Sequence, residues 1–267
     1  MALPLALAAA SPGKADDWAQ FRGPNCAGLA PGQQSLPVEF DTNKNLAWSV
    51  NLGDGIGSPV VANGRVFVSE MTSEEEVSLV CVDLASGKVL WRRAFATGTL
   101  PDIHKTNSHA ATTAAPDAQR VFFYCSTRGM LACDAATGKL LWKQEIPEPY
   151  FVFKWGPGMS PILYEDKVIF LQDDDLAPAI YAFDKATGAI AWQVDRADMA
   201  TNYSHPVILS TEQGDELIVA GTGKLQAYDP ANGKELWQAR VLLRNIKTTP
   251  VVKDGVVYIS LQSGGIA

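Results

Sequence analysis

Two of the three histidines of the chain lie in one stretch, TGTLPDIHKTNSHAATT, at positions 97–113. His104 and His109 are accompanied there by Asp102 and Asn107. Imidazole titrates near neutral pH and is a common metal ligand, so acid–base or metal chemistry is conceivable in this stretch. The spacing of the two histidines outside a helix is not a metal-ligand signature, and hydrogen-bonded loop histidines are the favoured interpretation. Whether any metal binds stays open.

A second stretch, IPEPYFVFKWGPG at 146–158, places aromatic residues between prolines and glycines. Tyr150, Phe153 and Trp155 are candidates for contacting a protein or a polysaccharide, because exposed aromatic side chains mark binding surfaces. The competing and slightly preferred interpretation is that the rings fold over the end of a sheet as a lid on the core.

Two further residues complete the candidate ligand- or partner-binding set. Arg22, in QFRGPN, could reach an anion in a central channel or form a salt bridge near the N-terminus. His205 begins an apolar stretch, where a structural role in the core or channel is favoured. No residue of the chain is assigned a catalytic role.

Acidic residues cluster in EEE at 74–76 and DDD at 173–175. The first is typical of a solvated hairpin tip. The second could offer oxygen ligands to calcium, but it lacks the alternating acidic spacing of a calcium loop, so a solvated loop is expected. The sequence also contains no glycine-rich phosphate loop, no G-x-S-x-G and no HExxH.

The four cysteines are Cys26, Cys81, Cys125 and Cys133, and none forms a CxxC pair. Cys125 and Cys133 flank the turn STRG, and in one interpretation they face each other across a hairpin and form a disulfide. Buried free thiols are the favoured alternative.

A nine-residue phrase, D-x-x-[STN]-G-x-x-x-W, occurs four times and indicates the elements that carry these loops. It reads DLASGKVLW, DAATGKLLW, DKATGAIAW and DPANGKELW, at 83–91, 134–142, 184–192 and 229–237. A period of this length indicates stacked supersecondary units. Alternating apolar stretches flank each phrase, and Asn-Gly, Glu-Asp and Asp-Gly pairs supply hairpin turns. We therefore predict that each unit is a four-stranded antiparallel β-sheet.

Turn chemistry suggests a structural role for the phrase. Its Asp accepts backbone N–H groups of the turn, its Gly adopts a positive φ, and its Trp lies on the outer strand. A small residue two places before the Asp would leave room for an indole from a neighbouring sheet. The phrase is thus expected to join sheets rather than to catalyse. The residues assigned to this joining role are Trp48, Asp83, Gly87, Trp91, Asp134, Gly138, Trp142, Asp184, Gly188, Trp192, Asp229, Gly233 and Trp237.

These phrases resemble the PQQ-like (pyrroloquinoline-quinone-like) β-propeller repeat, A-x-D-x-x-T-G-x-x-x-W. The stretches DWAQFRGPNCAGLAP, HKTNSHAATTAAPDAQRVFFYCS and WGPGMSPILYEDKVIF are similar to exported members that open with W-x-Q-F-R-G-P-N. The resemblance implies a β-propeller fold, with relatives among quinoprotein dehydrogenases, which use PQQ and calcium, and a propeller lipoprotein of outer-membrane barrel assembly. The adjacent cysteines and calcium-ligand set of the dehydrogenases find no match here. Cys26 lies too far from the apolar leader for lipid attachment.

The expected fold is therefore an all-β propeller of four-stranded blades, seven or eight when complete and about four and a half in this chain. Residues 1–15 are expected to be a signal-peptide remnant or a disordered leader. Residues 16–267 would form the propeller, truncated at its C-terminus, with the Trp48 strand closing the ring. The chain would otherwise be the propeller part of a larger fusion.

The function expected from these features is a non-catalytic binding or scaffold module of the bacterial envelope, periplasmic or extracellular. Its partner would be an envelope protein or a polysaccharide, and an incomplete ring would favour self-association. The net charge of −7 argues against nucleic acid, and no apolar run is long enough for a membrane span. No cofactor is expected; the alternative is a PQQ- and calcium-dependent oxidoreductase.

Overall fold

The structure, a computed structural model, describes residues 17–30, 37–241 and 247–260. Within these ranges the chain forms four four-stranded sheets, one two-stranded sheet and a single short 3₁₀-helix, η1 (Pro24–Cys26). All strand pairs are antiparallel, and within each sheet a strand pairs with the next one along the chain. The predicted all-β fold of four-stranded blades is confirmed, and the two-stranded sheet matches the predicted half blade.

The strands follow the predicted repeat closely. Blade one holds β1 (Val60–Ala62), β2 (Arg65–Ser73), β3 (Glu76–Asp83) and β4 (Val89–Ala96). Blade two holds β5 (Ala115–Pro116), β6 (Arg120–Cys125), β7 (Gly129–Asp134) and β8 (Leu140–Gln144). Blade three holds β9 (Ile162–Tyr164), β10 (Lys167–Gln172), β11 (Ala179–Asp184) and β12 (Ile190–Asp195). Blade four holds β13 (Val207–Thr211), β14 (Gly214–Gly221), β15 (Lys224–Tyr228) and β16 (Glu235–Arg240), and the last pair is β17 (Val251–Lys253) and β18 (Val256–Tyr258).

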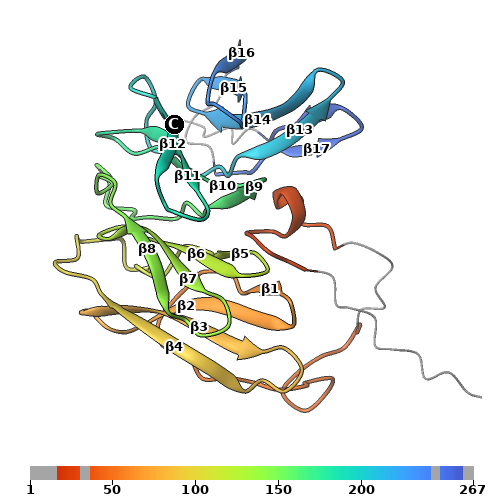
Figure 1. Ribbon diagram of the computed structural model, residues 1–267, viewed down its shortest axis with the longest axis vertical. Helices are drawn as coiled ribbons and strands as arrows, with labels where there is room; N and C mark the ends of the chain where they lie inside the picture. The colour runs from red at the N-terminus through yellow and green to blue at the C-terminus, as the bar shows by residue number, and fades with distance from the viewer. Residues whose placement is uncertain (1–16, 31–36, 242–246, 261–267) are drawn as a thin grey trace, which may run out of the picture.

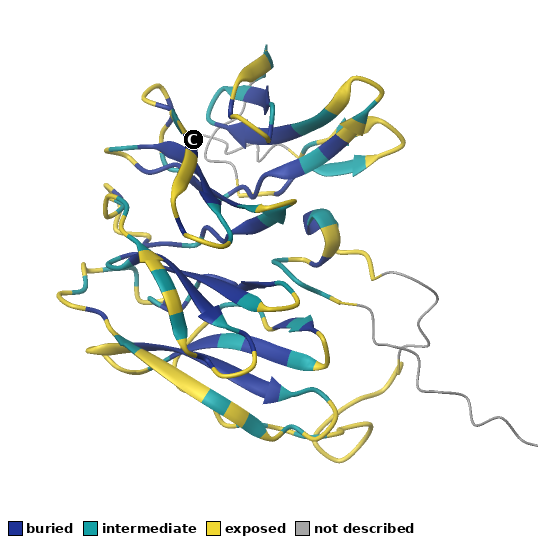
Figure 2. Ribbon diagram, in the orientation of Figure 1, coloured by how far each residue is buried: buried dark blue, intermediate teal, exposed yellow. Residues whose placement is uncertain are grey.

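The apolar cores lie between successive blades. In β6, Phe122 and Tyr124 pack toward blade three, whereas Phe123 and Cys125 pack toward blade one. Because side chains alternate along a strand, a middle strand enclosed by two neighbouring blades must be apolar on both faces. Outer strands such as β4 are instead largely exposed (Figure 2).

The blades fan out from a common inner side, where β1, β5, β9 and β13 lie toward the N-terminal segment that carries η1 (Figure 1). Since the strands are antiparallel, their connections alternate between two ends of the blades. We call the end with the β1–β2 and β3–β4 type hairpins the turn face. The end with the β2–β3 type hairpins and the long links between blades is the loop face.

Each repeated phrase forms a compact turn on the turn face. Asp134 Oδ1 accepts both the backbone N–H and the hydroxyl of Thr137, at 2.8 and 2.7 Å. These bonds favour the ionised carboxylate and hold the pKa of Asp134 below its ordinary value. Gly138 follows with a φ of 70°, which lets the chain turn back into β8.

Trp48 and the tryptophans of the first three phrases each contact the glycine of the phrase in the next blade. The Trp142 indole N–H donates to Lys185 O at 3.0 Å, and a Cβ built on Gly188 would lie 2.6 Å from the ring. The same contact joins three further pairs, namely Trp48 to Gly87, Trp91 to Gly138 and Trp192 to Gly233. The blade-to-blade contact therefore needs a residue without a side chain at this position.

The small residue before each Asp lies beside a different indole from the one expected. Ala132 pairs with Trp142 of its own blade across the β7–β8 ladder, and the register shifts immediately after it. Cys81, Ala182 and Ala227 pair in the same way with the tryptophans of their own blades. The glycine, not this small residue, makes room for the indole of the preceding blade.

The expectation that Cys125 and Cys133 face each other is wrong. The turn after β6 pairs Cys125 with Gly129 and Cys133 with Val121, so the two thiols lie at different ladder positions. All four cysteines are free and buried, as the favoured alternative predicted. Burial raises the pKa of the Cys26 and Cys133 thiols to about 12, so neither is a thiolate at neutral pH.

The N-terminal segment 17–30 runs along the inner strands. Trp18 exchanges two backbone hydrogen bonds with Val61 of β1, at 2.8 and 3.0 Å. The Asn25 side chain donates to Ile208 O and accepts from Ile208 N, at 2.8 and 2.7 Å. The segment therefore ties blade one to blade four across the inner side.

The leader expected at 1–15 lies outside the described residues. No helix of the described part of the chain is long and apolar enough to cross a membrane.

Candidate functional site

The two long loops that the sequence singled out lie against each other on the loop face. An ion pair joins Asp102 and Lys154 at 2.8 Å, and the His104 N–H donates to Lys154 O at 2.6 Å. The Asn107 amide donates to Trp155 O at 2.5 Å and to Pro157 O at 3.0 Å. Side-chain bonds between the loops thus fix the course of the aromatic stretch.

The aromatic stretch presents most of its rings to solvent. Exposed fractions are 53% for Tyr150, 75% for Phe153 and 46% for Trp155. Only Phe151 is buried, where it packs on Tyr203 with ring centroids 6.1 Å apart. The lid interpretation therefore holds for Phe151 and is wrong for the three candidate residues. Together with two exposed aliphatic neighbours they form what we call the aromatic patch: Tyr150, Val152, Phe153, Trp155 and Leu176.

The two loop histidines have different surroundings. The His104 ring packs on Trp155 with centroids 4.6 Å apart, and its Nδ1 lies 2.8 Å from the Thr106 hydroxyl. His109 lies deeper, and burial lowers its pKa. Among the described residues no three or more His, Cys, Asp or Glu side chains are grouped to hold a metal ion.

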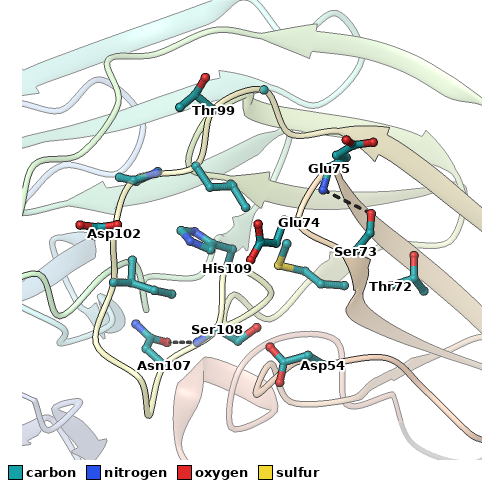
Figure 3. Close-up of a pocket in the computed structure, with 15 residues that line it drawn as sticks. Asp54, Thr72, Ser73, Glu74, Glu75, Thr99, Asp102, Asn107, Ser108 and His109 are labelled. Atoms are coloured by element: carbon teal, nitrogen blue, oxygen red, sulfur yellow. Dashed lines mark hydrogen bonds between the residues drawn. The ribbon is translucent and has the colours of Figure 1, made fainter.

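A cleft of about 750 Å³ opens between the loop after β4 and the β2–β3 hairpin. Its lining includes Asn107, Ser108 and His109 from the loop and Thr72 through Glu75 from the hairpin. Figure 3 shows the Glu74 carboxylate and the His109 ring extending from these two walls toward the middle of the cleft. The sequence predicted Glu74 as part of an exposed hairpin tip, which is confirmed, but did not reveal that the tip borders a cleft.

His205 lies at the loop-face end of blade four and is buried. Its Nε2 accepts the Ser160 N–H at 3.1 Å, and its ring stacks on Phe21 at 4.2 Å. Desolvation and the nearby Arg22 charge lower the pKa of His205 to about 4, so the ring is neutral at pH 7. These contacts place His205 in a structural position on the inner side.

The His205 contact is one link of a hydrogen-bonded belt. Ser58 N–H donates to Thr113 Oγ1 and Thr113 N–H donates to Ser160 Oγ, both at 3.0 Å. Each link joins equivalent positions of successive blades. A sequence signal exists for this belt, because Ser58, Ser160 and His205 each precede a proline that opens an inner strand.

The expectation of a solvated DDD loop is wrong for two of its three residues. Asp173 and Asp174 are fully buried, and only Asp175 is exposed. Asp174 Oδ1 accepts the N–H groups of Leu176 and Ala177 at 2.8 and 2.6 Å, which accounts for its burial.

Asp173 forms a two-pronged ion pair with the buried Arg196, with N–O distances of 2.7 and 3.0 Å. The remaining guanidinium nitrogen of Arg196, Nη1, donates to the side chains of Gln226 and Tyr228 in blade four, both at 2.8 Å. Asn202 adds a bond to Asp173 at 3.0 Å. This network joins blades three and four beneath the loop face, and sequence reasoning missed it.

Arg22 is exposed and forms no salt bridge with any described residue. Its backbone has a φ of 60°, and its guanidinium lies beside Gly28. The salt bridge considered for this residue is thus absent from the described ranges.

The family model for outer membrane protein assembly factor BamB matches residues 73–267. The chain belongs to this family. It is 25% identical to the outer membrane protein assembly factor BamB of Moranella endobia, over 87% of this chain and 62% of that protein. It is 27% identical to quinohemoprotein alcohol dehydrogenase ADH IIB of Pseudomonas putida, over 69% of this chain and 28% of that protein. The chain therefore spans less than two thirds of the length of these curated relatives.

Solved structures show the same fold. BamB from Moraxella catarrhalis superposes with a TM-score of 0.54 and 20% identity, over 78% of this chain and 56% of that one. Quinohemoprotein alcohol dehydrogenase from Comamonas testosteroni superposes with a TM-score of 0.57 and 16% identity, over 84% of this chain and 41% of that one. The resemblance to PQQ-like propellers is thereby confirmed.

The dehydrogenase relatives raise the question of a quinone and calcium site. Calcium needs six to eight oxygen ligands, and the described residues contain no such grouping of carboxylates. The buried pair Asp173 and Asp174 is already engaged by Arg196 and by backbone N–H groups. Among the described residues, neither carboxylate of this pair is free to hold calcium.

Proposed function

We propose that the protein is a non-catalytic scaffold of the bacterial envelope, exported to the periplasm or beyond, that binds a protein partner through the aromatic patch. The observation that carries this proposal is the exposure of Tyr150, Phe153 and Trp155 together on the loop face. The relatives named as outer membrane protein assembly factors support a role in protein assembly.

The patch is suited to binding because it is held in place before a partner arrives. Asn107 fixes the backbone of Trp155, and the Asp102–Lys154 ion pair links the two loops. Large aromatic side chains contribute much contact area, and a fixed loop loses little conformational entropy on binding. Such a surface fits a protein interface better than a reaction centre, which would need converging acid, base or nucleophilic groups.

The test is a double variant, Phe153→Ala with Trp155→Ala, used for capture from the envelope fraction of the source organism. Both side chains are exposed, so we expect unchanged folding and at least a tenfold loss of the captured protein. The matched control is Phe40→Ala with Tyr258→Ala, which removes two exposed rings outside the patch. Equal capture by the two double variants would contradict the proposal. Capture of an envelope polysaccharide instead of a protein would show that the partner is a polysaccharide.

The alternative function, a PQQ- and calcium-dependent oxidoreductase of alcohols or sugars, is favoured by similarity to quinoprotein dehydrogenases. It predicts bound-quinone absorbance and dye-linked oxidation after the full-length protein is incubated with PQQ and calcium. We expect neither. Turnover that requires both additions would establish the alternative in place of the scaffold.

A further inference from the structure

The large cleft continues into the aromatic patch. A second hollow of about 210 Å³ shares Pro101, Asp102 and Ile103 with the cleft and extends to Tyr150 and Phe151. A third, of about 150 Å³, shares Phe151 with the second and is lined by Phe153 and Trp155. The three hollows therefore lie next to one another on the loop face, and we call them together the groove. Their volumes offer room for more than one side chain of an extended segment.

The charges along this groove are unevenly distributed. Four carboxylates line the cleft at one end, and no Lys or Arg lines it: the acids are Asp54, Glu74, Glu75 and Asp102. Of these, only Asp102 forms a salt bridge within the described residues. Burial lowers the pKa of His109, which disfavours a positive charge on this ring. The other end is lined by Lys154, which is paired with Asp102, and by Lys247 together with Asp175.

Apolar side chains also line the acidic cleft, including Met71, Leu100 and Ile103. Lysine and arginine combine an apolar stem with a charged head, and such side chains place the stem on apolar surface and the head among carboxylates. A bare divalent cation fits less well, because the carboxylates are not grouped for coordination and the cleft is far larger than an ion.

We propose that this acidic cleft takes a lysine or arginine side chain from an extended segment of the protein partner. Apolar side chains of the same segment then lie on the aromatic patch. The inference rests on the proposed function. It adds the chemistry of the partner segment and the orientation in which that segment binds. The carboxylates of the aromatic end are balanced by Lys154 and Lys247, whereas most of those of the cleft are not. A basic side chain therefore gains most in the cleft, and the segment binds in one orientation.

The experiment begins with selection of phage-displayed random 12-residue peptides on the full chain. We expect enriched sequences to contain a Lys or Arg on one side of an apolar cluster. The best peptide is then synthesised with a fluorophore, and its affinity is measured by anisotropy. Glu74→Gln with Glu75→Gln removes two exposed charges, and we expect affinity to fall about fivefold or more, together with a weaker salt dependence.

The matched control is Glu165→Gln with Glu212→Gln, which removes two exposed carboxylates on the turn face and should leave affinity unchanged. Enrichment of peptides without basic residues, no enrichment, or equal affinity of the two double variants would overturn the inference. Displacement of the peptide by calcium chloride but not by sodium chloride of equal ionic strength would also overturn it, in favour of a metal site.

The outcomes for the proposed function remain separate. If Phe153→Ala with Trp155→Ala loses the envelope partner while Glu74→Gln with Glu75→Gln retains it, the scaffold function stands and the basic-segment inference fails. If the patch variant retains the partner, the scaffold function itself fails.

Discussion

The turn face and the loop face of the blades are built by opposite means. On the turn face the same contact recurs, as in Trp142 over Gly188 and Trp192 over Gly233. Between the two long loops of the loop face each contact occurs once, as in the Asp102–Lys154 ion pair or the Asn107 bonds to the aromatic stretch. Repetition therefore accompanies the joining of blades, whereas the groove is made from residues without counterparts in other blades.

This difference suggests that the turn face determines stability and the loop face determines recognition. The division is incomplete, because buried polar groups beneath the loop face also join blades. Arg196 and His205 both belong to the loop-face end and are both buried. Removing them tests whether stability depends on the face of the molecule or on burial between blades.

The largest effect is expected from Arg196→Met. The variant leaves Asp173 as an uncompensated buried charge, so the free energy of unfolding should fall by about 4 kcal/mol. Urea denaturation would measure this. The control is Lys224→Met, which breaks the more exposed ion pair with Asp198 and should cost less than about 1 kcal/mol. Similar losses for both variants would show that burial between the blades does not increase the contribution of the ion pair to the free energy of unfolding.

His205 should make stability depend on pH. Its pKa is about 4 in the folded protein and near its ordinary value of 6.5 when unfolded, so the unfolded chain binds more protons between these values. Stability is then complete above pH 6.5 and falls by up to about 3 kcal/mol as the pH drops to 4. The pKa of His109 is also lowered, but its ring is only half-buried whereas the His205 ring is buried. His205→Gln should therefore flatten this slope more than His109→Gln does. The reverse ranking in urea melts at a series of pH values would contradict the assignment.

The Trp–Gly contact of the turn face can be tested by comparing Gly188→Ala with Gly64→Ala. Both glycines have a positive φ, 76° and 72°, but a Cβ meets the Trp142 indole only at Gly188. Both alanine variants therefore carry the same backbone strain. The clash of the new Cβ with the Trp142 ring should make Gly188→Ala more destabilising than Gly64→Ala by about 2 kcal/mol. Thermal or urea unfolding measures the difference. Introducing Trp142→Ala into both proteins should remove most of it, and a difference that persists would place its cause outside the indole.

The parts of this fold that the sequence predicted depend on short-range chemistry. Asp134, Thr137, Gly138 and Trp142 lie within nine residues, so turn geometry and strand period can be read from them directly. Four repeats then fix the blade, because units of one kind stack in one way.

The parts that the sequence did not predict depend on distant partners or on register. In the sequence, Asp173 resembles part of a solvated acidic run. Its buried partner, Arg196, comes from another loop and lies beside it only in the folded chain. The interpretation in which Cys125 and Cys133 face each other fails because the register that the turn sets pairs them with Gly129 and Val121 instead. The acidic cleft is likewise formed by two loops that meet only in the folded chain.

The smallest expected effect concerns the N-terminal segment, which belongs to neither face. Asn25→Ala removes two side-chain hydrogen bonds to Ile208, whereas Asn45→Ala removes one exposed bond to Glu39 O. Both asparagines have a positive φ, 49° and 59°, so the backbone cost of alanine is shared. Asn25→Ala should therefore be more destabilising by about 1 kcal/mol, measured by urea denaturation. Equal losses would mean that the segment contacts blade four without stabilising it.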